Sequence, residues 1–191
     1  MVIQPHCPYM SVAEYLASEE RSDLRHEYIG GRIYAMTGAS DRHNLIATNL
    51  VAELRPRLRG TSCQLFVADM KLRIAIAGED IFYYPDLMVC CDPEDRATYY
   101  RIRPCLLVEI ASESTERIDR REKLLSYMRI ESLQAYLILS QQTMRASLYR
   151  CDSDWQAAVV TDPQTILALP CAGLQLSLAS AYEDVPLGAD S

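Results

Sequence analysis

One run in the middle of the chain, residues 105–111, restricts the possible folds most strongly. Its sequence, CLLVEIA, is apolar at every position except Glu109. A strand that is apolar on both faces needs cover on both faces, as central strands of α/β proteins have. A carboxylate in such a strand is costly unless a cation, an arginine or several hydrogen-bond donors accompany it. The run predicts a central strand, with Glu109 either in a structural salt bridge or in a functional site.

The segments on both sides of this run fit a mixed α/β architecture. A second doubly apolar run at 135–140 follows a helical pattern at about 116–130, which predicts a parallel strand pair joined by a right-handed crossover. Other predicted helices and strands, in chain order, are a helix at 11–18, a hairpin at 25–36, a helix at 40–60, and strands at 63–68, 69–77, 81–91, 144–150 and 155–160. We therefore expect one mixed β-sheet flanked by helices, preceded by an N-terminal helix and a β-hairpin.

Length and composition are consistent with one domain. The 191 residues are 49% hydrophobic and 24% charged, so the chain can bury a real core. We expect a single domain over residues 1–191, with its core at about 10–160 and a C-terminal tail at 161–191. No apolar run has the length of a membrane span, and the N-terminus does not resemble a secretory signal, so we expect a cytoplasmic protein without membrane contact.

The seven cysteines are scattered and odd in number. They form no C-x-x-C pair, and no histidine lies at zinc-ligand spacing from any of them. We interpret them as small buried hydrophobic residues in a reducing compartment, and the spacing argues against a structural zinc site.

The charged residues exclude one class of function and draw attention to two positions. A formal net charge of −7 argues against a protein that coats nucleic acid, because such binding relies on Lys and Arg. A nuclease remains compatible, since its metal-binding carboxylates are acidic. Of the 19 basic residues, Lys71 and Lys123 are the two lysines and the other 17 are arginine. In a chain with so few lysines, each lysine is a stronger candidate for a specific role than an ordinary surface lysine would be.

Asp86 is a second carboxylate that, together with Glu109, favours a functional site over a structural salt bridge. It follows Pro85 at the start of an apolar strand pattern, which by itself also fits an ordinary turn or strand start. If the strands that carry Asp86 and Glu109 are neighbours, the two carboxylates can lie side by side. Such a pair of oxygen ligands suits Mg²⁺ or Mn²⁺.

Lys123 is the third candidate. Asp119, Lys123 and Tyr127 follow one another at intervals of four residues, so they lie along one stripe of the predicted helix after the Glu109 strand. A solvent-exposed ion pair between Asp119 and Lys123 is the ordinary alternative, worth only about 0.2–0.5 kcal/mol.

These segments together resemble a known family. Pro85-Asp86, the run 108–112 and the stripe through Lys123 are similar to the Uma-two family of restriction endonuclease-like proteins, within the PD-(D/E)XK nuclease superfamily. Segments 25–33 and 69–73 and the helix that carries His43 resemble it too. The resemblance covers about residues 10–140 and implies a restriction-endonuclease-like sheet.

The resemblance also implies roles for individual residues. Asp86 and Glu109 would be metal ligands, the Ile110 carbonyl a further ligand, and Mg²⁺ or Mn²⁺ the cofactor. Lys123 would supply the catalytic ammonium, because Ala111 stands where the superfamily usually has lysine. Glu27, from the hairpin, is a further candidate near the metal, with an exposed strand glutamate as the alternative.

Other polar residues carry weaker signals. His43 could contact a phosphate or water, although a histidine near a helix start more often makes a local hydrogen bond. Lys71 is an alternative source of the ammonium. His6 and His26 carry no signal above background.

The function that follows is metal-dependent endonuclease cleavage of DNA, with the arginines at 117, 120 and 121 available for phosphate contacts. One alternative is a catalytically degenerate nuclease fold that binds nucleic acid or forms a homodimer. A second alternative is an unrelated α/β enzyme or ligand-binding domain in which Asp86 and Glu109 are ion-paired.

Overall fold

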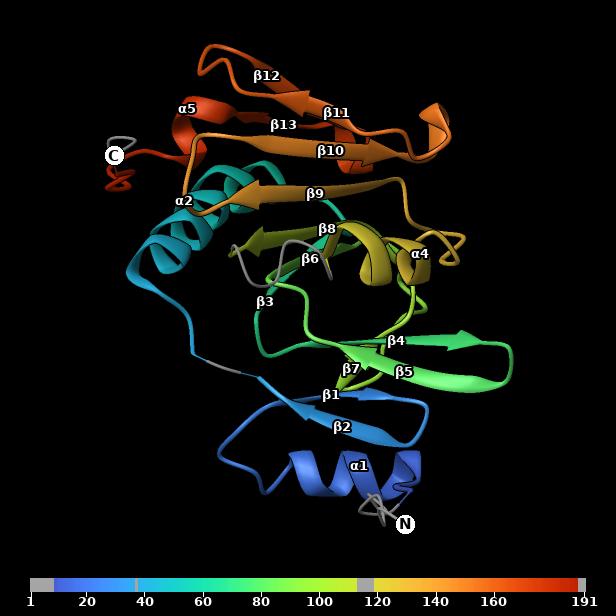
Figure 1. Ribbon diagram of the computed structural model, residues 1–191. Helices are drawn as coiled ribbons and strands as arrows, with labels where there is room; N and C mark the ends of the chain where they lie inside the picture. The colour runs from blue at the N-terminus through green and yellow to red at the C-terminus, as the bar shows by residue number, and fades with distance from the viewer. Residues whose placement is uncertain (1–8, 37, 113–118, 189–191) are drawn as a thin grey trace.

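The computed structural model describes residues 9–36, 38–112 and 119–188. The fold contains two large β-sheets and a small β-hairpin (Figure 1). One sheet has six strands in the order β11-β10-β9-β8-β6-β3, and the other has five in the order β2-β1-β5-β4-β7. The chain begins beside the five-stranded sheet and ends beside the six-stranded sheet, so the two termini lie at opposite ends of the molecule in this view.

The six-stranded sheet contains β3 (Gln64–Val67), β6 (Leu87–Cys90), β8 (Pro104–Ala111), β9 (Ala135–Ser140), β10 (Ala146–Arg150) and β11 (Ala158–Val160). The five-stranded sheet contains β1 (His26–Ile29), β2 (Arg32–Ala35), β4 (Lys71–Ile76), β5 (Glu79–Tyr83) and β7 (Tyr100–Arg101). The hairpin is β12 (Ile166–Leu169) and β13 (Leu174–Ser177). The helices are α1 (Val12–Glu19), α2 (Asp41–Arg57), the π-helix η1 (Asp119–Lys123), α4 (Leu124–Tyr127), α5 (Leu178–Ala181) and the 3₁₀ turns η2 (Cys151–Ser153) and η3 (Cys171–Gly173).

Local sequence signals account for the first elements. The Ser11 and Glu14 side chains form a complete capping box at the start of α1. Gly30 and Gly31 have φ of 52° and 89°, which the tight turn between β1 and β2 requires and other residues tolerate poorly. The Ser40 side chain accepts a hydrogen bond from the His43 amide and caps α2. The predicted starts of these elements are confirmed, while α2 ends at Arg57, three residues before the expected end at residue 60.

Two of the passages of the chain between the large sheets run from β3 to β4 and from β5 to β6. The passage from β5 to β6 breaks the continuous strand that was expected at 81–91, so that expectation is wrong. Pro85 has no amide hydrogen to extend the ladder, and the Asp86 carbonyl instead accepts a hydrogen bond of 2.9 Å from the Ala68 amide. The two crossing segments are thereby bonded to each other, and Asp86 lies at the junction of the sheets.

The central strands of the six-stranded sheet are covered on both faces, as the sequence predicts. Leu106, Val108 and Ile110 of β8 pack into one hydrophobic cluster, together with α2 and the C-terminal hairpin. Leu107 and Ala111 point the other way, into a second cluster that also contains β4 and Tyr127. This second cluster fills the space between the two sheets.

The predicted parallel pair is confirmed, because β8 and β9 pair in parallel over the full length of β9. The helix expected at 116–130 is shorter in the described part, where η1 and α4 together cover residues 119–127. Residues 113–118 of that expectation lie outside the described residues. The mixed α/β fold class is confirmed, with the strands divided between two sheets rather than joined in one.

The C-terminal segment contributes to the core. Leu167, Leu169, Leu174, Leu176 and Leu178 are buried and pack in the same cluster as α2 and β8. The core boundary expected near residue 160 therefore does not hold. The strand expected at 155–160 begins only at Ala158.

The cysteines also differ from expectation. Disulfides join Cys63 to Cys91 and Cys105 to Cys171, so the interpretation of all cysteines as free thiols is wrong. Cys90 is free and buried, and Cys151 is free and exposed. Distant positions in the sequence meet at one end of the sheet, which spacing alone does not reveal.

Within the described ranges, every helix is too short or too polar to cross a bilayer.

Removing buried volume from the hairpin tests whether the C-terminal segment is part of the core. Leu176 is fully buried, and replacing it with alanine leaves a cavity, so Leu176→Ala is expected to lower the free energy of unfolding by about 2–5 kcal/mol. Gln175→Ala, at the exposed neighbouring position, is the control and is expected to change little. Urea denaturation followed by circular dichroism measures both, and equal stability of the two variants would contradict a core role.

Candidate functional site

Glu109 is buried on the face of β8 that faces the space between the two sheets. Only 4% of its surface is exposed. Its Oε1 atom lies 3.0 Å from the Lys123 ammonium and accepts a hydrogen bond of 2.9 Å from the Tyr127 hydroxyl. The carboxylate thus has both a cation and a neutral donor, which its position in an apolar strand requires.

Lys123 lies at the end of η1 and is nearly as buried as Glu109. Besides Glu109, its ammonium contacts the Glu27 carboxylate at 3.2 Å. It also lies 5.6 Å from the centre of the Tyr83 ring, within the range of a cation–π contact. Glu27 comes from β1, so Lys123 links the five-stranded sheet to the six-stranded sheet.

Asp86 lies directly before β6, next to the strand that carries Glu109. Leu87 pairs with Val108, and extending this register by one residue places Asp86 opposite Glu109. The Asp86 Oδ2 atom accepts a hydrogen bond of 2.7 Å from the Ile110 amide. Within a strand, the N–H and C=O of one residue point to the same edge. The Ile110 carbonyl therefore points to the edge of β8 that Asp86 occupies.

His43, at the start of α2, completes the surroundings of Asp86. Its Nε2 atom lies 3.0 Å from Asp86 Oδ1. Burial lowers the pKa of His43, but the hydrogen bond to Asp86 and the charge of that carboxylate outweigh burial, and the net pKa is above its ordinary value. The contact between His43 and Asp86 thus both raises the pKa of His43 and holds this carboxylate in a fixed orientation.

Tyr127 is fully buried and donates its hydroxyl hydrogen to Glu109. Its burial, followed by the nearby charge of Glu109, raises the pKa of the phenol well above the usual value. The ring packs edge-on against Tyr83 and Tyr136. This packing fixes the hydroxyl on Glu109.

The ligand atoms around Asp86 and Glu109 match a hard divalent cation. They are carboxylate and carbonyl oxygens, and Mg²⁺ is commonly held by one or two carboxylates while it keeps several waters. The carboxylates do not form a tight three-ligand group; within the described ranges, the three-residue group with ligand atoms inside 4.8 Å consists of cysteines. Two carboxylates and one carbonyl fit Mg²⁺ or Mn²⁺, whereas a dense cage of the kind typical of Ca²⁺ does not occur here.

The remaining sequence candidates lie elsewhere. The Lys71 ammonium lies over the rings of Tyr84 and Tyr99, at 5.4 and 6.0 Å from their centres, and in the described part of the chain no ion pair joins it to Asp86 or Glu109. His26 contacts Glu19 at 2.9 Å. His6 lies outside the described residues.

A cavity of about 610 Å³ lies apart from these carboxylates. Three arginines line it, Arg73, Arg103 and Arg129, together with residues of β4 and of the segment 129–132. Arg73 is paired with Asp80 and Arg103 with Asp92. Its lining does not include Asp86, Glu109 or Lys123.

Two contacts were missed at the level of sequence. The sequence predicts that Tyr127 shares a helix face with Lys123 but not that its hydroxyl binds Glu109. The interval of four residues between Lys123 and Tyr127 is the signal that could have indicated this contact. The buried Glu19, which accepts hydrogen bonds from Tyr84 and contacts His26, had no signal. This second network anchors the residue that directly precedes Pro85 and so supports the passage between the sheets.

Comparison with known proteins identifies the family. The sequence profile of the Uma2 (Uma-two) family, described as "Putative restriction endonuclease", matches residues 12–179. The chain therefore belongs to the Uma2 family of nuclease-like proteins.

Individual relatives agree with this assignment. An uncharacterized protein of Synechocystis sp., slr1290, is 39% identical over 151 residues, which cover 78% of each chain. A second one, sll1609, is 31% identical over 159 residues, or 82% of this chain and 89% of the relative. A crystal structure described as a putative nuclease of the DUF820 family, from Anabaena variabilis, matches with a TM-score of 0.71 at 15% identity, over 91% of this chain and 98% of that one. This last likeness supports the nuclease-type fold.

Removing the ammonium tests the electrostatic role of Lys123. Lys123→Met leaves Glu27 and Glu109 without their shared cation, so we expect the free energy of unfolding to fall by about 3–5 kcal/mol. The double variant Lys123→Met/Glu109→Gln also removes the charge of Glu109, the more buried of the two carboxylates, and is expected to recover part of that loss. Arg57→Met, in an exposed pair on α2, is the control with little expected change. Urea denaturation tests all three, and an unchanged Lys123→Met stability would contradict the account.

Proposed function

We propose that the protein is a metal-dependent endonuclease that hydrolyses phosphodiester bonds in DNA. The observation that supports this proposal most strongly is a pair of contacts at and next to Glu109. The Lys123 ammonium lies 3.0 Å from the Glu109 carboxylate, and the amide of the next residue, Ile110, donates a hydrogen bond to Asp86. Membership of a family described as restriction endonuclease supports the same reaction class.

In this proposal Asp86 and Glu109 provide carboxylate ligands, and the Ile110 carbonyl provides a third oxygen. The hydrogen bond from the Ile110 amide to Asp86 supports this set, because it holds Asp86 beside the residue that follows Glu109. When bound, Mg²⁺ or Mn²⁺ supplies Lewis-acid polarisation of the phosphate and makes water more acidic. Glu27 is held close through Lys123 and serves as a further acidic group at the rim of the site.

The protein's own groups stabilise and position charge. Lys123 is buried beside Glu109, and there its ammonium can stabilise the negative charge that develops on the phosphate during attack by water. Tyr127 and His43 each hold one carboxylate by a hydrogen bond, so neither carboxylate must be reoriented when the substrate binds. The superfamily usually has a lysine on the strand at the position that Ala111 occupies here. In this chain, we propose that the ammonium of Lys123, from the helical segment that follows, takes the role of that lysine.

DNA is the proposed substrate, although the chain has a formal net charge of −7. Phosphate contacts then depend on local basic groups. Arg121 is exposed two positions before Lys123, which suits a backbone contact near the reacting phosphate. Residue 117 of the expected arginine cluster lies outside the described residues.

The alternative of a catalytically degenerate, DNA-binding or dimeric nuclease fold is favoured by one observation. Lys123 is engaged by two carboxylates at 3.0 and 3.2 Å, which is also how a purely structural ion pair would look. The two experiments that follow separate an active site from a structural pair.

Metal binding can be measured directly by calorimetric titration with Mn²⁺. The parent chain is expected to bind, and Asp86→Asn and Glu109→Gln are expected to lose measurable binding because each removes a charged ligand. His43→Ala, which removes only the group that orients Asp86, is expected to weaken binding by about 10–100-fold. Glu53→Gln, in an exposed pair on α2, is the matched control. Equal heats for all variants, or none in the parent, would contradict the proposed ligands.

Plasmid nicking in Mg²⁺ or Mn²⁺ tests the reaction itself. Lys123→Ala is expected to reduce the rate by about 10²–10³-fold, the usual cost of removing one electrostatic group that stabilises a transition state. The Mn²⁺ affinity of the same variant is measured beside the rate. Background cleavage in the parent and in Lys123→Ala alike would instead favour the degenerate alternative.

A further inference from the structure

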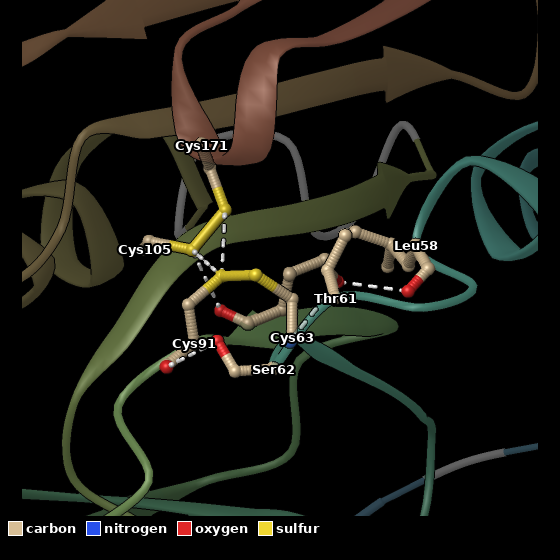
Figure 2. The surroundings of a disulfide bond; sticks show 8 residues. Leu58, Thr61, Ser62, Cys63, Cys91, Cys105 and Cys171 are labelled. Atoms are coloured by element: carbon tan, nitrogen blue, oxygen red, sulfur yellow. Dashed lines mark hydrogen bonds between the residues drawn. A yellow bond between two sulfur atoms is a disulfide. The ribbon is translucent and has the colours of Figure 1, made fainter.

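Four cysteines from four separate segments meet at one end of the six-stranded sheet. Cys63 precedes β3, Cys91 follows β6, Cys105 lies in β8 and Cys171 lies in η3. Figure 2 shows the sulfur atoms of the two pairs facing each other, with Cys171 reaching down from the C-terminal segment. Neither disulfide belongs to the carboxylate site, and the arrangement is independent of the proposed nuclease function.

The distances between the two pairs resemble those of a metal–thiolate site. The Cys91 sulfur lies 3.4 Å from that of Cys105 and 4.0 Å from that of Cys171. A tetrahedral zinc site with Zn–S bonds of about 2.3 Å has sulfur atoms about 3.8 Å apart, a value between these two distances. Cys91, Cys105 and Cys171 thus form a group whose sulfur atoms lie within 4.8 Å of one another. The fourth sulfur, from Cys63, lies next to this group because it is bonded to Cys91.

We propose that these four cysteines form a structural zinc site when the two disulfides are reduced. Two molecules of a small thiol reduce each disulfide, which yields two protein thiols and one small-molecule disulfide. The four thiols then lose four protons as they bind one Zn²⁺, because thiolates are the ligand form. Four thiolate ligands select Zn²⁺ over the hard cations that suit Asp86 and Glu109.

The surroundings indicate a structural rather than a catalytic role. Cys105 and Cys171 are buried in the hydrophobic cluster that contains α2 and the hairpin, and four protein ligands complete a tetrahedron without an open position. The site would tie the C-terminal segment to the ends of β3, β6 and β8. Cys105 and Glu109 are four residues apart on one strand, or about 13 Å, so the two sites lie toward opposite ends of β8.

The two free described cysteines are natural controls. Cys90 faces the other hydrophobic cluster, and burial followed by the charge of Asp95 raises the pKa of its thiol to about 12. Cys151 is exposed on η2. Neither belongs to the four-sulfur group. Spacing along the chain does not reveal this group, because its members come from segments up to 108 residues apart, from Cys63 to Cys171.

Cobalt provides a spectroscopic test of the site on the full chain. The protein is reduced with a phosphine under anaerobic conditions, freed of metal and titrated with Co²⁺. We expect the visible bands of tetrahedral, thiolate-bound cobalt to saturate at one ion per chain and to disappear when one equivalent of Zn²⁺ is added. Cys171→Ser is expected to lose this spectrum, and Cys151→Ser, the matched control, to retain it. No tetrahedral thiolate spectrum in the reduced parent, or an unchanged one in Cys171→Ser, would overturn the proposal.

Thiol alkylation tests the zinc site in the parent chain without any substitution, so the result does not depend on whether a variant folds. With Zn²⁺ bound, mass spectrometry is expected to show Cys63, Cys91, Cys105 and Cys171 protected and Cys151 modified. Modification of all five at the same rate with and without Zn²⁺ would contradict the zinc site. The carboxylate site is tested separately by Mn²⁺, so failure of either proposal leaves the other intact.

Discussion

The ion pair between Glu109 and Lys123 is a buried charged contact that links the two large sheets through Glu27, and it constrains every residue around it. Glu109 is buried in the central strand β8, where an unpaired carboxylate would cost several kcal/mol. Lys123 compensates it and simultaneously contacts Glu27 of the other sheet. A buried charge pair of this kind contributes little net stability compared with an apolar pair of the same shape. A pair of this kind in the core therefore agrees with the catalytic role that we propose for it.

The position of Asp86 follows from a backbone constraint rather than from a charge. Pro85 interrupts the ladder, the chain passes from one sheet to the other, and the Ala68 amide captures the Asp86 carbonyl. The Asp86 side chain is thereby left beside the edge of β8, where the Ile110 amide and His43 bind it. Buried Tyr84 anchors the same passage through Glu19. The passage of the chain between the sheets thus positions the Asp86 carboxylate, whereas the pairing of β8 with its neighbouring strands positions the Glu109 carboxylate.

Much of this could be predicted from the sequence because its signals are local. The apolar run 105–111 predicts a strand covered on both faces, and the structure divides its side chains between two hydrophobic clusters. The four-residue interval between Lys123 and Tyr127 predicts a shared face, and both side chains contact Glu109. The placement of these residues is seen in the structure, while their catalytic roles remain proposals.

The misses share a physical cause: they depend on contacts between distant segments. The break at Tyr84–Asp86 depends on pairing with residue 68, which no periodicity within 81–91 reveals. The C-terminal leucines were assigned to a tail because their pattern is short, yet they complete the cover of α2 and β8. The cysteines have no motif spacing, and only the fold brings four of them together.

Anomalous scattering from a Mn²⁺-soaked crystal tests the central claim most directly, because it locates the ion and its ligands in one experiment. The account predicts one peak at the junction of the sheets, about 2.0–2.2 Å from oxygens of Asp86 and Glu109 and from the Ile110 carbonyl. Lys123 would remain within contact distance of Glu109. A crystal with full Mn²⁺ exposure and no peak between these two carboxylates would contradict the account.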